Sequence, residues 1–139
     1  MSPVQLDLLK DLALSYDSKL YKCRDLTSIK MRVEEVGRQL FNTLFEHLPL
    51  ETSHLIATTN AADFTQQTQT DTRQLVYGEI EFDSFTEVLG VAVRQLDSRT
   101  KFVDLGHGIG KAIMAAVFVT DFSSFHGVEI LQGLHDSST

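Results

Sequence analysis

Three glycines and two carboxylates in the second half of the chain are spaced like the parts of one binding site. Gly106, Gly108 and Gly110 alternate with other residues, and Asp104 stands two residues before the first glycine. Glycines allow a backbone to approach a ligand closely. Glu129 follows the last glycine at about the 20-residue spacing at which an acidic side chain binds ribose hydroxyls. The pattern therefore indicates binding of an adenosyl ligand at a tight turn.

The elements that must position these residues are a strand, a turn, a helix and a second strand. Residues 101–105 form a short apolar run that ends at a glycine, which predicts a buried strand. Residues 112–119 have no polar face, so we expect a buried helix there, and residues 125–130 predict a second strand. This order is one βαβ unit, whose strands are normally parallel. It would bring Asp104 and Glu129 to the same end of the sheet.

The first half of the chain has the pattern of helices followed by a polar linker. Apolar residues recur in helical register over residues 6–20, and again from a helix cap expected at Thr27–Ser28 to Pro49. Residues 58–74 are polar with little to bury, which predicts a connecting loop. Residues 84–96 predict a further helix. We expect a helical region with a polar linker over residues 1–74 and a ligand-binding α/β domain over residues 75–139.

Composition and charge restrict the classes of partner. The chain has 12 basic and 19 acidic residues, a formal net charge of −7, which argues against direct nucleic-acid binding by this chain alone. A basic partner suits this charge, and so does plain solubility. Cys23 is the only cysteine, so an internal disulfide is excluded, no metal site is expected, and a reducing compartment is indicated. The apolar run 112–119 is far shorter than the about 20 residues that span a membrane.

The residue after the last glycine separates two classes of adenosyl ligand. A dinucleotide-binding G-x-G-x-x-G pattern would place its third glycine at position 111, which is Lys111. The observed Asp-x-Gly-x-Gly-x-Gly is similar to motif I of class I methyltransferases. Their cofactor has no pyrophosphate for a helix N-terminus to bind, but it has a methionine ammonium that a carboxylate near the turn can hold. S-adenosylmethionine is therefore favoured over a nicotinamide dinucleotide.

Further motifs make the resemblance more specific. In this order, the sequence resembles the Dot-type (disruptor of telomeric silencing) histone-lysine methyltransferases in Tyr77-Gly78-Glu79, in Phe82-Asp83, in residues 102–110 and in Gly127-Val128-Glu129. The resemblance covers about residues 75–130. The helical first half matches the family only in character. The resemblance implies N-terminal helices followed by the first βαβ unit of a class I methyltransferase, a Rossmann-like parallel sheet.

The resemblance also assigns contacts with S-adenosylmethionine. Tyr77 and Glu79 would lie on a loop that closes over the methionine end of the cofactor, and Asp104 would contact that same end. Glu129 would accept hydrogen bonds from the ribose hydroxyls. Close backbone approach would be provided by the glycines of the motif, Gly106, Gly108 and Gly110. The resemblance assigns no catalytic residue.

The function implied is methyl transfer from S-adenosylmethionine to a lysine in the globular core of histone H3, by an enzyme of the non-SET type. The partner would be the nucleosome, and the location the nucleus. Three positions depart from the family pattern: His107 replaces a frequent serine, Lys111 replaces an amide side chain, and Ile80 replaces a threonine.

The family's later segments are not found after Glu129, and residues 136–139 have the composition of a frayed tail. The missing segments clasp the adenine and line the lysine channel with Asn-Asn-x-Phe. We therefore expect a C-terminally truncated chain with little or no methyltransferase activity of its own. Two alternatives are left open. One is a truncated, non-catalytic relative that binds S-adenosylmethionine, and the other is a fragment of a nicotinamide-dependent oxidoreductase.

Overall fold

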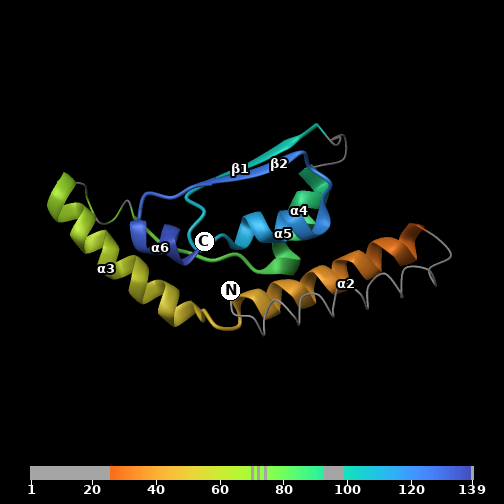
Figure 1. The fold of residues 1–139 in the computed structure, drawn as a ribbon, viewed down its shortest axis with the longest axis horizontal. Coiled ribbons are helices and arrows are strands. Elements are labelled where there is room, and N and C mark those ends of the chain that lie inside the picture. The colour runs from red at the N-terminus through yellow and green to blue at the C-terminus, as the bar shows by residue number, and fades with distance from the viewer. Residues whose placement is uncertain (1–25, 70, 72, 74, 93–98, 139) are drawn as a thin grey trace.

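The computed structural model describes residues 26–69, 71, 73, 75–92 and 99–138. Within these ranges the chain is of the α/β class, with the helices on one side of a two-stranded parallel sheet (Figure 1). In chain order the elements are α2 (Leu26–Phe45), α3 (Leu50–Thr68), α4 (Phe82–Ala92), β1 (Lys101–Leu105), α5 (Lys111–Val119), β2 (Ser124–Val128) and α6 (Gln132–Ser137). The helix predicted over residues 6–20 lies outside the described residues.

The predicted strand, turn, helix and strand are all present. Strands β1 and β2 are parallel, with Asp104 opposite Gly127 and Leu105 opposite Val128. Strand β2 begins at Ser124 and ends at Val128, slightly earlier than the predicted range 125–130. Asp104 is the last residue but one of β1, and Glu129 directly follows β2. Both carboxylates therefore lie at the carboxyl end of the sheet, as predicted.

Two apolar clusters hold the helices against this unit. Helices α2 and α4 pack against α5, where Phe41 and Phe82 are buried with their ring centroids 5.2 Å apart. Burying a side chain such as Phe82 contributes about 1.5–3 kcal/mol. Helices α3 and α6 pack together near the glycine turn (Figure 1). That second cluster contains Ala57, Ala61, Ile109, Leu131 and Leu134.

The strand and helix of the unit are less buried than their sequences predict. Along β1 the side chains alternate, with Phe102 and Asp104 half-buried and Val103 and Leu105 exposed. In α5 only Ala115 and Ala116 are fully buried, and Val117 is exposed. The prediction of a fully buried strand and helix is therefore wrong. The reason is that the described helices cover one face of the sheet only (Figure 1).

The loop predicted over residues 58–74 is wrong for residues 58–68, which continue helix α3. Its polar side chains bond to their own helix: the hydroxyls of Thr58 and Thr68 donate to carbonyls four residues earlier, at 2.7 and 2.8 Å. Every fourth residue on another side is small and buried, at Ser53, Ala57 and Ala61. That narrow stripe, rather than the polarity, decides the local structure.

Three other expectations also need correction. Residues 27 and 28 lie inside α2 rather than capping it, and α4 begins at Phe82, two residues before the predicted start. The predicted end of that helix, at residues 93–96, lies outside the described residues. Residues 136 and 137 belong to α6 rather than to a frayed tail. Helix α6 is ordered because the Gly133 amide donates to Asn60 Oδ1 at 2.8 Å, which joins it to α3.

The closest approach in the βαβ unit gives a first prediction. A Cβ at Gly127 would lie 2.5 Å from Ile113 Cδ1 and 2.5 Å from His107 Cδ2. We expect Gly127→Ala to lower the free energy of unfolding by about 1–3 kcal/mol through overpacking. The matched control is Gly90→Ala in α4, where a Cβ meets nothing within 4 Å. That change should stabilise the chain by about 0.5–1 kcal/mol. Urea denaturation measures both, and equal effects of the two changes would contradict the close packing.

Candidate functional site

The turn between β1 and α5 is built from glycines in the left-handed region. Gly106, Gly108 and Gly110 have φ of +84°, +56° and +86°. The amides of Gly106 and His107 both donate to the Val128 carbonyl, at 2.7 and 3.2 Å, so the turn folds back onto the end of β2. A Cβ at Gly108 would lie 2.9 Å from a ring carbon of Tyr77. Glycine is required there both for the backbone conformation and for the Tyr77 ring.

Glu129 ties this turn to the segment after β2. Its Oε2 accepts a hydrogen bond from the Gly108 amide at 2.8 Å, and its Oε1 accepts one from the Leu131 amide at 2.9 Å. A carboxylate offers about four lone-pair sites, so each oxygen can accept a further hydrogen bond from a ligand. Glu129 therefore has acceptor capacity left at the position where the sequence predicts ribose hydroxyls.

Tyr77 and Glu79 lie on the segment 75–81, which crosses over the turn. The Tyr77 hydroxyl donates to Glu79 Oε1 at 2.7 Å, and Lys111 Nζ forms an ion pair with Glu79 Oε2. The side chains of Lys111 and Glu79 are 18% and 9% exposed, so this pair is largely shielded from water. The Tyr77 ring also meets His54 of α3 edge-on, with the centroids 5.3 Å apart.

The pKa values of this segment follow from these contacts. Burial is the largest influence on the pKa of Glu79 and would raise it. Hydrogen bonds from Lys111, Tyr77 and Ser53, with the charge of Lys111, outweigh burial and hold the pKa of Glu79 below its ordinary value. Burial and the hydrogen bond to Glu79 raise the pKa of Tyr77 well above its ordinary value, so its hydroxyl stays a donor.

Asp104 is in a different environment from Glu79. Burial, with a smaller contribution from the Glu129 charge, raises the pKa of Asp104, and His107 opposes that shift. Among the described residues, Asp104 has no salt bridge. Asp104 is thus a half-buried carboxyl group without a salt-bridge partner among the described residues, and a cationic group of a ligand could take that place.

Two adjoining cavities bring most of the predicted residues together. One of about 100 Å³ is lined by residues that include Tyr77, Glu79, Asp104, Gly108 and Lys111. The other, of about 200 Å³, is lined by Glu129, Leu131 and Leu134 among others. Both cavities share Tyr77, Gly78 and Gly106 in their walls. Of the seven predicted contacts only Gly110, the N-cap residue of α5, lines neither cavity.

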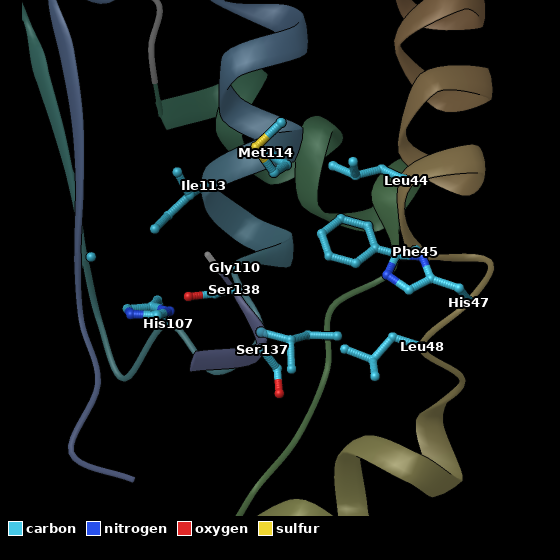
Figure 2. Close-up of a pocket in the computed structure, with 12 residues that line it drawn as sticks. Leu44, Phe45, His47, Leu48, His107, Gly110, Ile113, Met114, Ser137 and Ser138 are labelled. Atoms are coloured by element: carbon cyan, nitrogen blue, oxygen red, sulfur yellow. The ribbon is translucent and has the colours of Figure 1, made fainter. Parts of the chain in front are cut away.

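A third cavity, of about 400 Å³, also adjoins the glycine turn, at His107, Ile109 and Gly110 (Figure 2). Its walls are mainly apolar side chains of α5 and the end of α2, and it contains none of the predicted carboxylates. His107 lines it, 8% exposed, and its Nδ1 has no hydrogen-bond partner in the described structure. Figure 2 shows His107, Gly110 and Ser138 on the same side of this cavity, and His107 and Ile109 also line the smallest of the three cavities.

Sequence reasoning missed two residues of the site. Ser53 is fully buried beside Tyr77 and Glu79, and it comes from α3, where no contact was expected. The four-residue spacing of Ser53, Ala57 and Ala61 could have indicated one buried helix face that includes Ser53. Lys111 was noted as a departure from the family pattern but was not assigned to the site. Its pairing with a glutamate 32 positions away has no local signal in the sequence.

The described ranges contain neither a metal-binding cluster nor a membrane-spanning helix. No group of three or more His, Cys, Asp or Glu side chains there is arranged to hold a metal ion. Within the same ranges, no helix has both the length and the apolar character needed to cross a membrane.

The fold and the site define an α/β protein with a glycine turn and two carboxylates at the carboxyl end of a parallel βαβ unit. The chain belongs to the histone methylation protein DOT1 family, whose family model matches residues 55–138. The family is one of methyltransferases that act in histone methylation. No curated protein and no solved structure matches the sequence. The recognition of the family from the four ordered motifs is thus confirmed.

The unbalanced Asp104 gives a second prediction. Its pKa in the folded chain is raised above the unfolded value, so its ionisation opposes folding at any pH above both values. Asp104→Asn should therefore increase the free energy of unfolding near pH 7, by less than about 1 kcal/mol because solvent screens this half-buried group. The gain should shrink as the pH falls through the pKa of Asp104. Thermal denaturation from pH 3 to pH 8 measures this, with exposed Asp121→Asn as the control. A loss of stability at pH 7 would contradict it.

Proposed function

We propose that this chain binds S-adenosylmethionine across the two cavities beside the glycine turn, for methyl transfer to a lysine in the core of histone H3. The observation that carries the proposal is that Asp104 and Glu129 line two adjoining cavities with Gly106 in the walls of both, in a chain of the DOT1 family. The class I methyltransferase fold, a domain boundary near residue 75 and a nuclear location belong to the same proposal.

The described residues fit this cofactor chemically. Glu129 keeps acceptor capacity for ribose hydroxyls while its two backbone hydrogen bonds fix its orientation. Asp104 offers an unpaired carboxylate for the methionine ammonium. Gly106 lies between them and lines both cavities, so a ligand that spans the two must pass close to its backbone. No phosphate has to be accommodated at the N-terminus of α5, where Lys111 follows the last glycine.

Bound S-adenosylmethionine would supply a methyl group on a sulfonium, so no covalent intermediate with the protein is required. The residues of this chain would bind and orient that group. Tyr77 and Glu79 would cover the methionine end and exclude water from it. The accepting lysine must be neutral, because an ammonium has no lone pair, and alignment of the amine with the methyl group dominates the catalysis. We assign no general base.

The comparison with the family does not favour the alternatives. A nicotinamide-dependent oxidoreductase fragment has no support from the family, and Lys111 occupies the position of the third glycine that such a fold would need. A non-catalytic relative would use the same cofactor contacts, so the binding experiment below applies to it as well.

The cofactor proposal gives a third prediction. We expect Glu129→Ala to weaken binding of S-adenosylmethionine by about 1.5–3 kcal/mol, because charge-assisted hydrogen bonds to the ribose are lost. Glu81→Ala, at an exposed glutamate outside both cavities, should leave the affinity unchanged. Isothermal titration calorimetry measures the two variants beside the unchanged chain, with NAD as a second ligand.

Glu129 also holds the Gly108 and Leu131 amides, so the prediction needs a control for folding. Circular dichroism and urea denaturation of Glu129→Ala separate loss of the turn from loss of a ligand contact. Equal affinities of the Glu129→Ala and Glu81→Ala variants would end the ribose assignment. Tighter binding of NAD than of S-adenosylmethionine would overturn the proposed function.

A further inference from the structure

The segment 75–81 is closed down on the glycine turn in this structure. The Tyr77 ring lies against Gly108, and its hydroxyl is held by Glu79. The cavities on either side have volumes of about 100 and 200 Å³, with Tyr77, Gly78 and Gly106 between them. Ligand pockets usually have volumes of about 300–1,000 Å³. Each cavity alone is smaller than that, and Tyr77 and Gly78 stand between the two, so a ligand that reaches from Glu129 to Asp104 must displace part of this segment.

The contact that joins the closed segment to α5 is the ion pair of Lys111 with Glu79. With Tyr77 on one oxygen of Glu79 and Lys111 on the other, the carboxylate is satisfied by the chain itself. Removing Lys111 without replacing its charge would leave a largely buried carboxylate unpaired, which is costly. An incoming ammonium group in the cavity that Asp104 and Glu79 both line can replace the lysine ammonium at Glu79 without that cost, and it can face Asp104 at the same time.

Lys111 also has neighbours on α2 that could hold its ammonium group in place of Glu79. Its Nζ lies 5.5 Å from the centroid of the Phe45 ring, at a distance suited to a cation–π contact. It also lines an open groove with Phe41, Asn42, Thr43, Phe45 and Glu46 on the side of α2. A lysine displaced from Glu79 can therefore keep its charge near an aromatic face and near the carboxylate of Glu46.

We propose that Lys111 is a latch that holds the segment 75–81 closed through Glu79 and yields its place there to the ammonium group of a ligand. Lys111 would thereby set how the site discriminates between adenosyl ligands with and without an ammonium. It is a positioning residue and does not contact the reacting atoms. The ligand class rests on the proposed function, whereas the closure of the segment does not.

The test compares Lys111→Gln with Lys111→Arg and with Lys101→Gln, the same change at an exposed lysine of β1. Calorimetric titration uses three thioethers: S-adenosylhomocysteine, 5′-deoxy-5′-methylthioadenosine, which lacks the amino acid, and 5′-(3-aminopropylthio)-5′-deoxyadenosine, which has the ammonium without the carboxylate. Lys111→Gln should bind the two ammonium ligands about tenfold more tightly, because their competitor at Glu79 is gone. Its affinity for methylthioadenosine should stay within about twofold, and Lys111→Arg and Lys101→Gln should match the unchanged chain.

A second readout needs no ligand. Chymotrypsin should cut after Tyr77 about tenfold faster in Lys111→Gln than in Lys101→Gln, because the closed segment opens more often. The rates at the other cleavage sites, measured by mass spectrometry in the same digest, report on global unfolding. They should be the same in both variants.

Each result decides one of the two proposals. Weaker or unchanged binding of the ammonium ligands to Lys111→Gln, with methylthioadenosine still bound, would overturn the exchange at Glu79. Equal cutting after Tyr77 in Lys111→Gln and Lys101→Gln would overturn the latch. If no adenosyl ligand binds any variant, the proposed function fails, and the digest still decides whether Lys111 closes the segment.

Discussion

The carboxylate of Glu129 joins the two turns that follow the parallel strands. One oxygen holds the Gly108 amide and the other holds the Leu131 amide, at 2.8 and 2.9 Å. The glycine turn is thereby fixed against β2, and only then does Gly108 present a flat surface on which the Tyr77 ring can lie. The same carboxylate holds the amide of Leu131, the N-cap residue of α6, and so positions the apolar cluster that contains Leu131 and Leu134. The candidate ligand site and the apolar cluster around Leu134 thus both depend on the Glu129 side chain.

The βαβ unit could be predicted because its signals are local. Short apolar runs bounded by glycines define β1 and β2, and the absence of polar residues defines α5. Helix α3 could not be predicted in the same way, because its threonines satisfy their hydroxyls on their own helix. Its structure depends on a small-residue stripe that has meaning only when α6 lies against it, as the hydrogen bond from Gly133 to Asn60 shows. The exposure of β1 likewise depends on which elements cover the sheet.

The candidate site shows the same division between residue type and environment. The sequence identifies Glu79 and Asp104 as acidic residues near the turn, but it does not distinguish them. In the fold, Lys111 and Tyr77 lower the pKa of Glu79 despite its burial, whereas at Asp104 burial outweighs the opposing influence of His107 and raises the pKa. Ser53 comes from helix α3, which the sequence did not predict. Which carboxylate is satisfied and which is not follows from long-range packing and could not be predicted from spacing.

The face of the sheet that no described helix covers has a consequence for how the molecule behaves in concentrated solution. Val103, Leu105 and Val128 are 56%, 80% and 60% exposed, and they project from two neighbouring strands. Parallel strands are ordinarily covered on both faces, so this surface lowers its free energy by meeting another apolar surface. The formal net charge of −7 opposes such meetings at low ionic strength. Added sulfate screens that charge and strengthens apolar association together, so salting-out should begin at this face of the sheet.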